Sequence, residues 1–151
     1  TAAAPGPITD LQVSPDGVRV ALVVGGRVLM AALSVNDRGV PSLTGVYPLA
    51  PDLAGEVVDV AWSTAKTLFI ARAGDDVPVW RTSIAGTQPV EIVSGNLKPP
   101  VVELAASGTQ VYATDNRGVQ QIGTGTTRPD QYWTALGPDA GIGTVAVVPG
   151  R

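Results

Sequence analysis

The sequence predicts an all-β fold made of β-propeller blades, each a four-stranded antiparallel meander. Three observations predict it: a composition suited to short strands, a pattern that recurs three times, and a repeat length typical of one blade. We interpret residues 1–151 as a single partial β-propeller domain of about three blades plus one extra strand.

The composition favours many short strands. The chain of 151 residues contains 23 valines but only one Phe and one Met, and it is interrupted by 18 Gly and 13 Pro. β-Branched residues cut at short intervals by turn formers are typical of strands joined by tight turns. No window of a dozen residues is free of Gly and Pro while also showing a helical apolar stripe, so long helices are not expected.

The recurring pattern is an acid, then alternating apolar positions up to a serine, then a tight turn and a second apolar strand. The acids are Asp10, Asp59 and Glu103, and the serines are Ser14, Ser63 and Ser107. When Leu11, Val60 and Leu104 are aligned, the copies are 49 and 44 residues apart. Propeller blades repeat every 40 to 50 residues or so, and the spacing therefore predicts one blade per copy.

The first blade is expected over about residues 8–49. Its strands are predicted near Ile8–Val13, Val18–Val24, Arg27–Leu33 and Ser42–Leu49. Two dipeptides, Asp16-Gly17 and Gly25-Gly26, suit hairpin turns that need positive φ.

The second and third blades are expected over about 57–93 and 101–135. Predicted strands of the second are Val57–Trp62, Thr67–Ala73, Pro78–Ile84 and Pro89–Val93, and of the third Val101–Ala105, Gln110–Thr114, Gly118–Ile122 and Gln131–Ala135. A partial fourth copy, with Val145 in the place of Leu104, predicts an extra strand at 143–148. Three blades do not close a ring, so we expect either a longer parent protein or homo-association through open blade edges.

Several classes of function are disfavoured. The net charge is −3, and the ten basic residues are scattered, which argues against nucleic-acid binding. The chain has no Cys and no His, so serine triads, thiol chemistry and most zinc sites are excluded. We predict no catalytic residues, no metal site and no cofactor.

Some acids and one serine still merit attention as candidate sites. Asp75-Asp76 reads as an acidic hairpin tip rather than a calcium site, because calcium needs six to eight oxygens. The three in-phase acids line a central channel, face solvent on an alternating strand, or bond the backbone of a neighbouring blade. Ser14 lies in a Ser-Pro-Asp-Gly turn and has no His to activate it.

The tryptophans are candidates for packing or for binding a partner. Trp62 is in phase with Val13 and Ala106, which predicts a core position. Trp80, Arg81 and Trp133 are expected on outer strands or loops, and such residues serve equally as interface anchors and as contacts between blades. We name these three as speculative partner-binding residues.

The run from Ile8 to Leu33 resembles the propeller region of the actinobacterial LpqB lipoproteins, and Pro129 to Trp133 and Gly143 to Gly150 resemble their carboxyl end. The resemblance implies a protein anchored outside the cytoplasmic membrane by an N-terminal lipid, on a part this chain lacks, together with a GerMN domain. It also implies a non-enzymatic role: binding the extracellular domain of the sensor histidine kinase MtrB of a two-component system. The alternative is the propeller of a carbohydrate-active or peptidase-associated enzyme.

Overall fold

The computed structural model describes residues 6–74, 79–85, 90–91, 97, 101, 103–108, 110–115, 118–122 and 132–134. The regular secondary structure of this part of the chain is entirely β, in twelve strands. They form three four-stranded antiparallel sheets, each a meander of strands consecutive in sequence. The predicted all-β fold of about three blades is therefore confirmed.

The first blade contains β1 (Ile8–Val13), β2 (Arg19–Val24), β3 (Arg27–Val35) and β4 (Pro41–Pro48). Both predicted turns are present. Gly17 has φ 71°, and Gly25 and Gly26 have φ 56° and 73°, a backbone that residues with a Cβ rarely adopt. The third strand is longer than expected, because the β3–β4 ladder continues to the pair Val35–Pro41.

The second blade contains β5 (Val57–Thr64), β6 (Thr67–Arg72), β7 (Val79–Ser83) and β8 (Val90–Glu91). The third contains β9 (Glu103–Ser107), β10 (Gln110–Asp115), β11 (Gly118–Ile122) and β12 (Tyr132–Thr134). Asp75-Asp76 and the strand predicted at 143–148 lie outside the described residues.

The core lies between the blades. One cluster joins the first blade to the second and includes Val23, Met30, Val60, Trp62 and Ile70; the predicted core position of Trp62 is confirmed. Another cluster joins the second blade to the third and includes Phe69, Val79, Leu104, Val111 and Ile122. Each inter-blade cluster is apolar on both sides, so burial of these faces holds the blades together.

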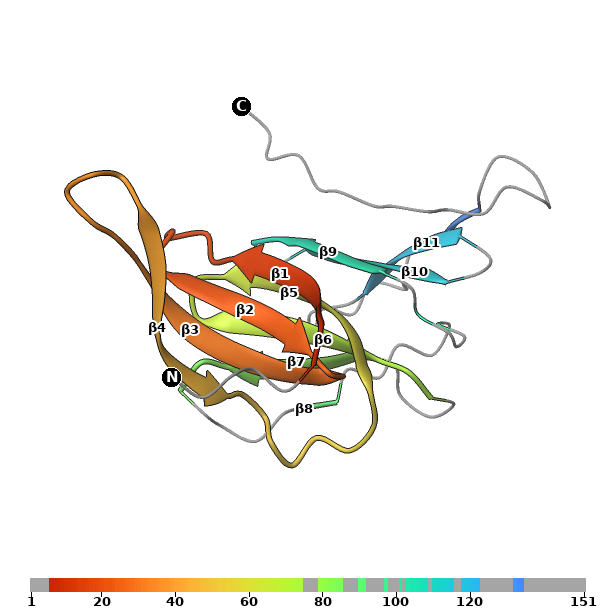
Figure 1. Cartoon of the computed structure of the whole chain (residues 1–151). Helices are drawn as coiled ribbons and strands as arrows, with labels where there is room; N and C mark the ends of the chain where they lie inside the picture. The colour runs from red at the N-terminus through yellow and green to blue at the C-terminus, as the bar shows by residue number, and fades with distance from the viewer. Residues whose placement is uncertain are drawn as a thin grey trace.

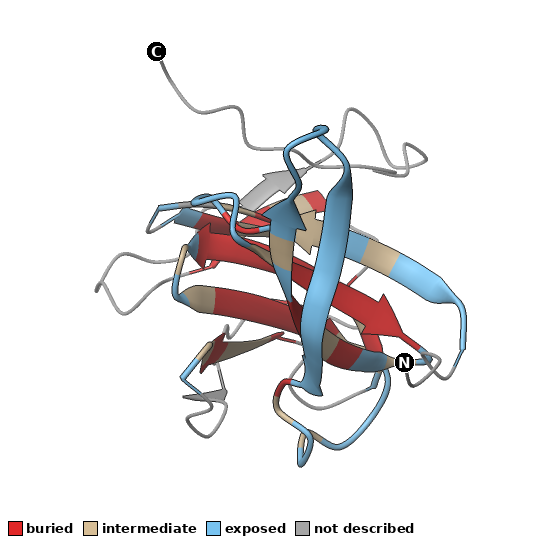
Figure 2. Ribbon diagram, turned by 60° about the vertical axis from the view of Figure 1, so that its left-hand side comes forward, coloured by how far each residue is buried: buried red, intermediate tan, exposed pale blue. Residues whose placement is uncertain are grey.

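The first strands of the three blades, β1, β5 and β9, lie side by side (Figure 1). The β3–β4 hairpin projects from the opposite side of the first blade. Figure 2 shows the contrast along this sheet, with a buried β2 and an exposed β4. The acids of the repeat therefore lie on the inner strands, and the most exposed strand of the blade lies on its outer side.

Candidate functional site

The in-phase acids join each blade to the next. Asp10 on β1 accepts a hydrogen bond at Oδ2 from the backbone N–H of Val60 on β5, at 3.3 Å. Asp59 on β5 accepts one at Oδ2 from the N–H of Leu104 on β9, at 2.5 Å. In each case the N–H donor is the residue that directly follows the repeat acid of the next blade: Val60 follows Asp59, and Leu104 follows Glu103. This regular geometry explains why the acids recur in phase. The sequence left three interpretations open for these acids, and the bond to a neighbouring blade is the one observed for Asp10 and Asp59.

Trp62 strengthens the first of these junctions. Its indole Nε1–H donates to the carbonyl oxygen of Gln12 on β1 at 3.0 Å, and its ring is only 6% exposed. A buried indole N–H needs such a partner. Glu103, the third acid, is half-buried at the start of β9.

Asp59 is the most perturbed acid of the junctions. Its pKa is raised from an ordinary 3.8 to about 7, chiefly because the residue is buried, with only 8% of it exposed. The Asp10 carboxyl contributes to this rise through a side-chain hydrogen bond and charge repulsion, while the N–H groups of Leu104 and Val60 oppose it. A carboxyl with a pKa near neutral is a common sign of an acid–base site. Here, however, its oxygen is engaged by the backbone of the next blade.

The Ser-Pro-Asp-Gly turn is a structural unit. The Gly17 N–H donates to the carbonyl of Ser14 at 2.8 Å, which closes the turn. The Ser14 hydroxyl donates to Asp16 Oδ1 at 2.5 Å and accepts from the Arg19 N–H at 3.0 Å. This hydroxyl bond, together with an ion pair of 2.9 Å to Arg19, lowers the pKa of Asp16. The Ser14 hydroxyl and the Asp16 carboxylate thus both help to hold the turn.

Replacement of Ser14 by alanine is expected to lower the free energy of unfolding by about 1 kcal/mol, because the buried hydroxyl bonds the Arg19 backbone. Chemical denaturation measures this change. Ser42→Ala on exposed β4 is the control, with an expected effect near zero. Equal effects of the two substitutions would contradict a structural role for Ser14.

The residues predicted to bind a partner are not brought together as one exposed patch in the described part. Trp80 on β7 is half-buried, packs against the core cluster between the first two blades, and has the Arg72 guanidinium 5.6 Å from its ring centroid. Arg81 is half-buried beside it. Trp133 pairs with Val119 through β12, and its side chain lies outside the described residues. Partner binding through these residues stays a prediction.

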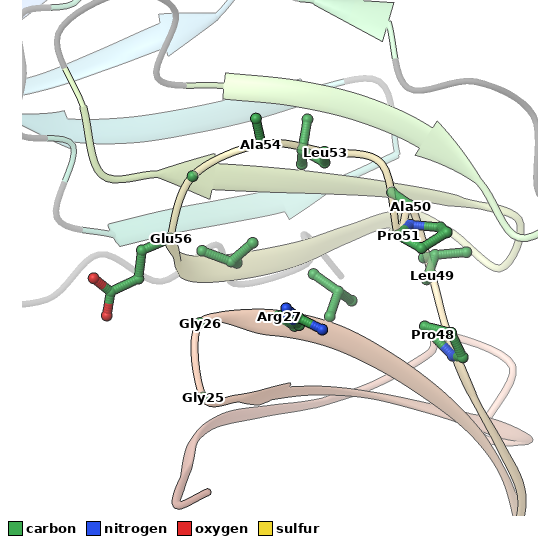
Figure 3. A pocket seen from close by; sticks show the side chains of 13 residues that line it. Gly25, Gly26, Arg27, Pro48, Leu49, Ala50, Pro51, Leu53, Ala54 and Glu56 are labelled. Atoms are coloured by element: carbon green, nitrogen blue, oxygen red, sulfur yellow. The ribbon is translucent and has the colours of Figure 1, made fainter. Parts of the chain in front are cut away.

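A cavity of about 580 Å³ lies between the first and second blades (Figure 3). It is lined by the Gly25-Gly26 turn and by the connection from Pro48 to Val57, and only Arg27 and Glu56 bring charges to its lining. In Figure 3 the Glu56 carboxylate points away from the apolar side chains of the cavity. Among the described residues, few polar groups are therefore directed into this cavity.

The β3–β4 hairpin is a feature that the sequence pattern did not single out. All eight residues of β4 are exposed, and the hairpin extends well beyond the body of its blade (Figure 1). Its tip is ordered by Asn36, whose Oδ1 accepts the N–H groups of Arg38 and Val40 at 2.9 Å each. Val40 and Tyr47 are 54% and 43% exposed. In the sequence, this hairpin is indicated only by the long interval between the apolar runs that form β3 and β4.

The family comparison bears on the whole chain. A model of the family described as "Lipoprotein LpqB beta-propeller domain" matches residues 1–149. The chain belongs to this LpqB propeller family. The resemblance noted from the repeat and from the carboxyl end is thereby confirmed.

Several curated relatives of this LpqB propeller domain carry the name "Lipoprotein LpqB". The relative from Rhodococcus opacus (strain B4) is 35% identical over 143 residues, which are 95% of this chain and 24% of that protein. Those from Nocardia farcinica (strain IFM 10152) and Mycobacterium leprae (strain TN) are 35% and 32% identical, over 95% and 97% of this chain and 24% and 25% of the relative. The chain thus spans about a quarter of the length of its relatives.

Within the described ranges, no group of three acidic, histidine or cysteine side chains is arranged to hold a metal ion. The same residues contain no helix that is long and apolar enough to cross a membrane.

Proposed function

We propose that this propeller domain is a non-catalytic protein-interaction module of an envelope lipoprotein. Its partner is the extracellular domain of a two-component sensor kinase of the MtrB type, as the family resemblance implies. The lipid anchor of such a lipoprotein would hold the propeller outside the cytoplasmic membrane. The relatives' name as lipoproteins supports this location.

The projecting β3–β4 hairpin is the observation that carries the proposal. An edge strand offers unpaired backbone N–H and C=O groups to a further strand, and natural proteins usually protect such edges. β4 is an edge strand of its sheet and is exposed along its whole length. Apolar side chains at the tip and on the strand, Val40 and Tyr47, add contact area for a protein surface.

The in-phase acids also support a binding role. Asp10 and Asp59 are the acids that sequence reasoning placed at a possible central site, and both accept backbone N–H groups from the next blade. Because these two acids join blades, we place partner binding on the exposed β3–β4 hairpin and not on the inner strands. Contact there would shift the kinase's sensor domain between its signalling states by differential binding.

A binding measurement between the intact lipoprotein and the kinase's extracellular domain tests the proposal. Charge reversal at the hairpin tip, Arg38→Glu, combined with Val40→Asp, is expected to weaken binding at least tenfold. Asp52→Arg, an exposed charge reversal on the connection to the second blade, is the matched control and is expected to leave binding unchanged.

The outcomes separate the surface from the partner. Binding that is lost on alanine substitution of Trp80, Arg81 or Trp133, but not of the hairpin, would move the interface to the second or third blade. No binding by the unmodified protein would overturn the kinase as partner.

A further inference from the structure

The cavity between the first and second blades has a buried apolar floor and an exposed rim. Val28, Leu49 and Val57 form the floor, and each is at most 5% exposed. Arg27 and Glu56 belong to the same lining and are exposed. The volume of about 580 Å³ lies within the range of small-molecule pockets, about 300–1,000 Å³. The cavity therefore has the size and the apolar floor of a ligand pocket.

The connection between the two blades, which forms one wall of the cavity, is held in place at both ends. The Leu49 N–H donates to the carbonyl of Val28 at 2.9 Å. The Val57 N–H donates to the carbonyl of Gly26, also at 2.9 Å. Between these bonds lies Ala50, with φ 52°, the one non-glycine residue of the described ranges that has a positive φ. Such strain persists where the surrounding structure enforces it, and it is common at ligand sites. The wall is thus preformed, which lowers the ordering cost of binding.

The charges around the cavity favour an anion. Glu56 packs over Gly26, with its Cγ 2.8 Å from the place of a Cβ on that glycine, and its carboxylate points away from the cavity (Figure 3). The Arg72 guanidinium lies directly behind the wall, since a Cβ on Gly55 would be 2.7 Å from its Nη2. Among the described residues, Arg72 forms no ion pair and its buried Nε has no hydrogen-bond partner. Arg27 in the lining adds a second positive charge.

We propose that this cavity binds a small amphiphile with an apolar body and one carboxylate. The apolar body lies on the floor formed by Val28, Leu49 and Val57. The carboxylate pairs with the Arg27 guanidinium, whose planar fork matches two carboxylate oxygens. The positive charge of Arg72 behind the wall adds to the attraction and disfavours a cationic ligand. This small-molecule site is additional to the protein contact proposed for the β3–β4 hairpin.

Two probes of equal chain length and opposite charge, octanoate and octylammonium, test the proposal by NMR titration of the isotope-labelled chain near neutral pH. Octanoate is expected to shift the amide signals of Val28, Leu49 and Val57, and octylammonium to bind at least tenfold more weakly. Butyrate is expected to bind more weakly than octanoate, by about two- to fourfold for each methylene that it lacks. Equal binding of the two octyl probes, or octanoate shifts confined to other residues, would overturn the proposal.

Substitution of the two charged lining residues locates the carboxylate. Arg27→Gln is expected to weaken octanoate binding at least tenfold, because charge-assisted hydrogen bonds are lost, and to leave the fold intact because Arg27 is exposed. Glu56→Gln is the matched control and is expected to leave octanoate binding unchanged or tighter. Equal losses in the two variants would contradict the pairing with Arg27.

The same chemistry has two sources, a free aliphatic acid and the C-terminus of a peptide that ends in an apolar residue. N-acetyl-leucine represents the second source. Tighter binding of N-acetyl-leucine than of octanoate would assign the cavity to a peptide C-terminus, and weaker binding would assign it to an aliphatic acid. Failure of both carboxylates to bind would overturn the proposal.

Discussion

Replacement of Phe69 by alanine is expected to lower the free energy of unfolding by about 3–5 kcal/mol, the largest effect of any single substitution considered. Phe69 is 1% exposed and lies in the cluster that joins the second blade to the third. Truncation removes its apolar contacts with both sheets and leaves a cavity that rigid strands fill poorly.

Denaturant unfolding measures this effect. Tyr47→Ala on exposed β4 is the matched aromatic control and is expected to cost less than about 1 kcal/mol. Since domains of this size are stable by only about 5–15 kcal/mol, Phe69→Leu provides a milder variant that stays folded. Similar losses for Phe69→Ala and Tyr47→Ala would show that the junction between these blades contributes little to stability.

Substitution of Asp59 is expected to change how stability depends on pH. The folded-state pKa of Asp59 is raised to about 7 from 3.8, so between pH 4 and 7 the folded protein binds more protons at this site than the unfolded chain. Its contribution to stability is therefore greatest below pH 4, falls as the pH rises to 7, and is constant above that. Asp59→Asn removes this titration but keeps an oxygen that can accept the Leu104 N–H.

The comparison of Asp59→Asn with the parent isolates the effect from that of other acids. The variant is expected to gain stability relative to the parent as the pH is raised from 5 to 8, measured by urea unfolding at each pH. Asp59→Ala leaves the Leu104 N–H without its acceptor and is expected to cost roughly 1–3 kcal/mol at both values. Parallel pH profiles for the parent and Asp59→Asn would mean that Asp59 titrates normally.

Much of the fold was predictable because its signals are local. Turns at Asp16-Gly17 and Gly25-Gly26 follow from the backbone freedom of glycine, and the strands between them follow from alternation of apolar residues. Recurrence of the acids in phase predicted that they share one place in each blade. Their partners were not predictable, since the residue that Asp59 bonds is 45 positions away.

The candidate surface was harder to predict than the fold. The sequence left Trp80 open as a partner contact or as a contact between blades, and the structure places it half-buried against the core beside Arg72. The β3–β4 hairpin carries no motif, and its exposure arises because no strand of the described ranges packs over β4. Exposure of this kind belongs to the assembled sheets and cannot be read from one strand.

Local patterns were enough to predict the all-β class, the repeated blade and the in-phase acids, because periodicity and turn chemistry act over a few residues. Three further properties arise only when the sheets pack: Asp10 and Asp59 join consecutive blades, burial beside Asp10 raises the pKa of Asp59, and Leu11 stays exposed while Val60 is buried. Those properties depend on which face of each sheet packs against another sheet. Residues with the same local sequence pattern therefore differ in burial when one of them has no described blade packed against it.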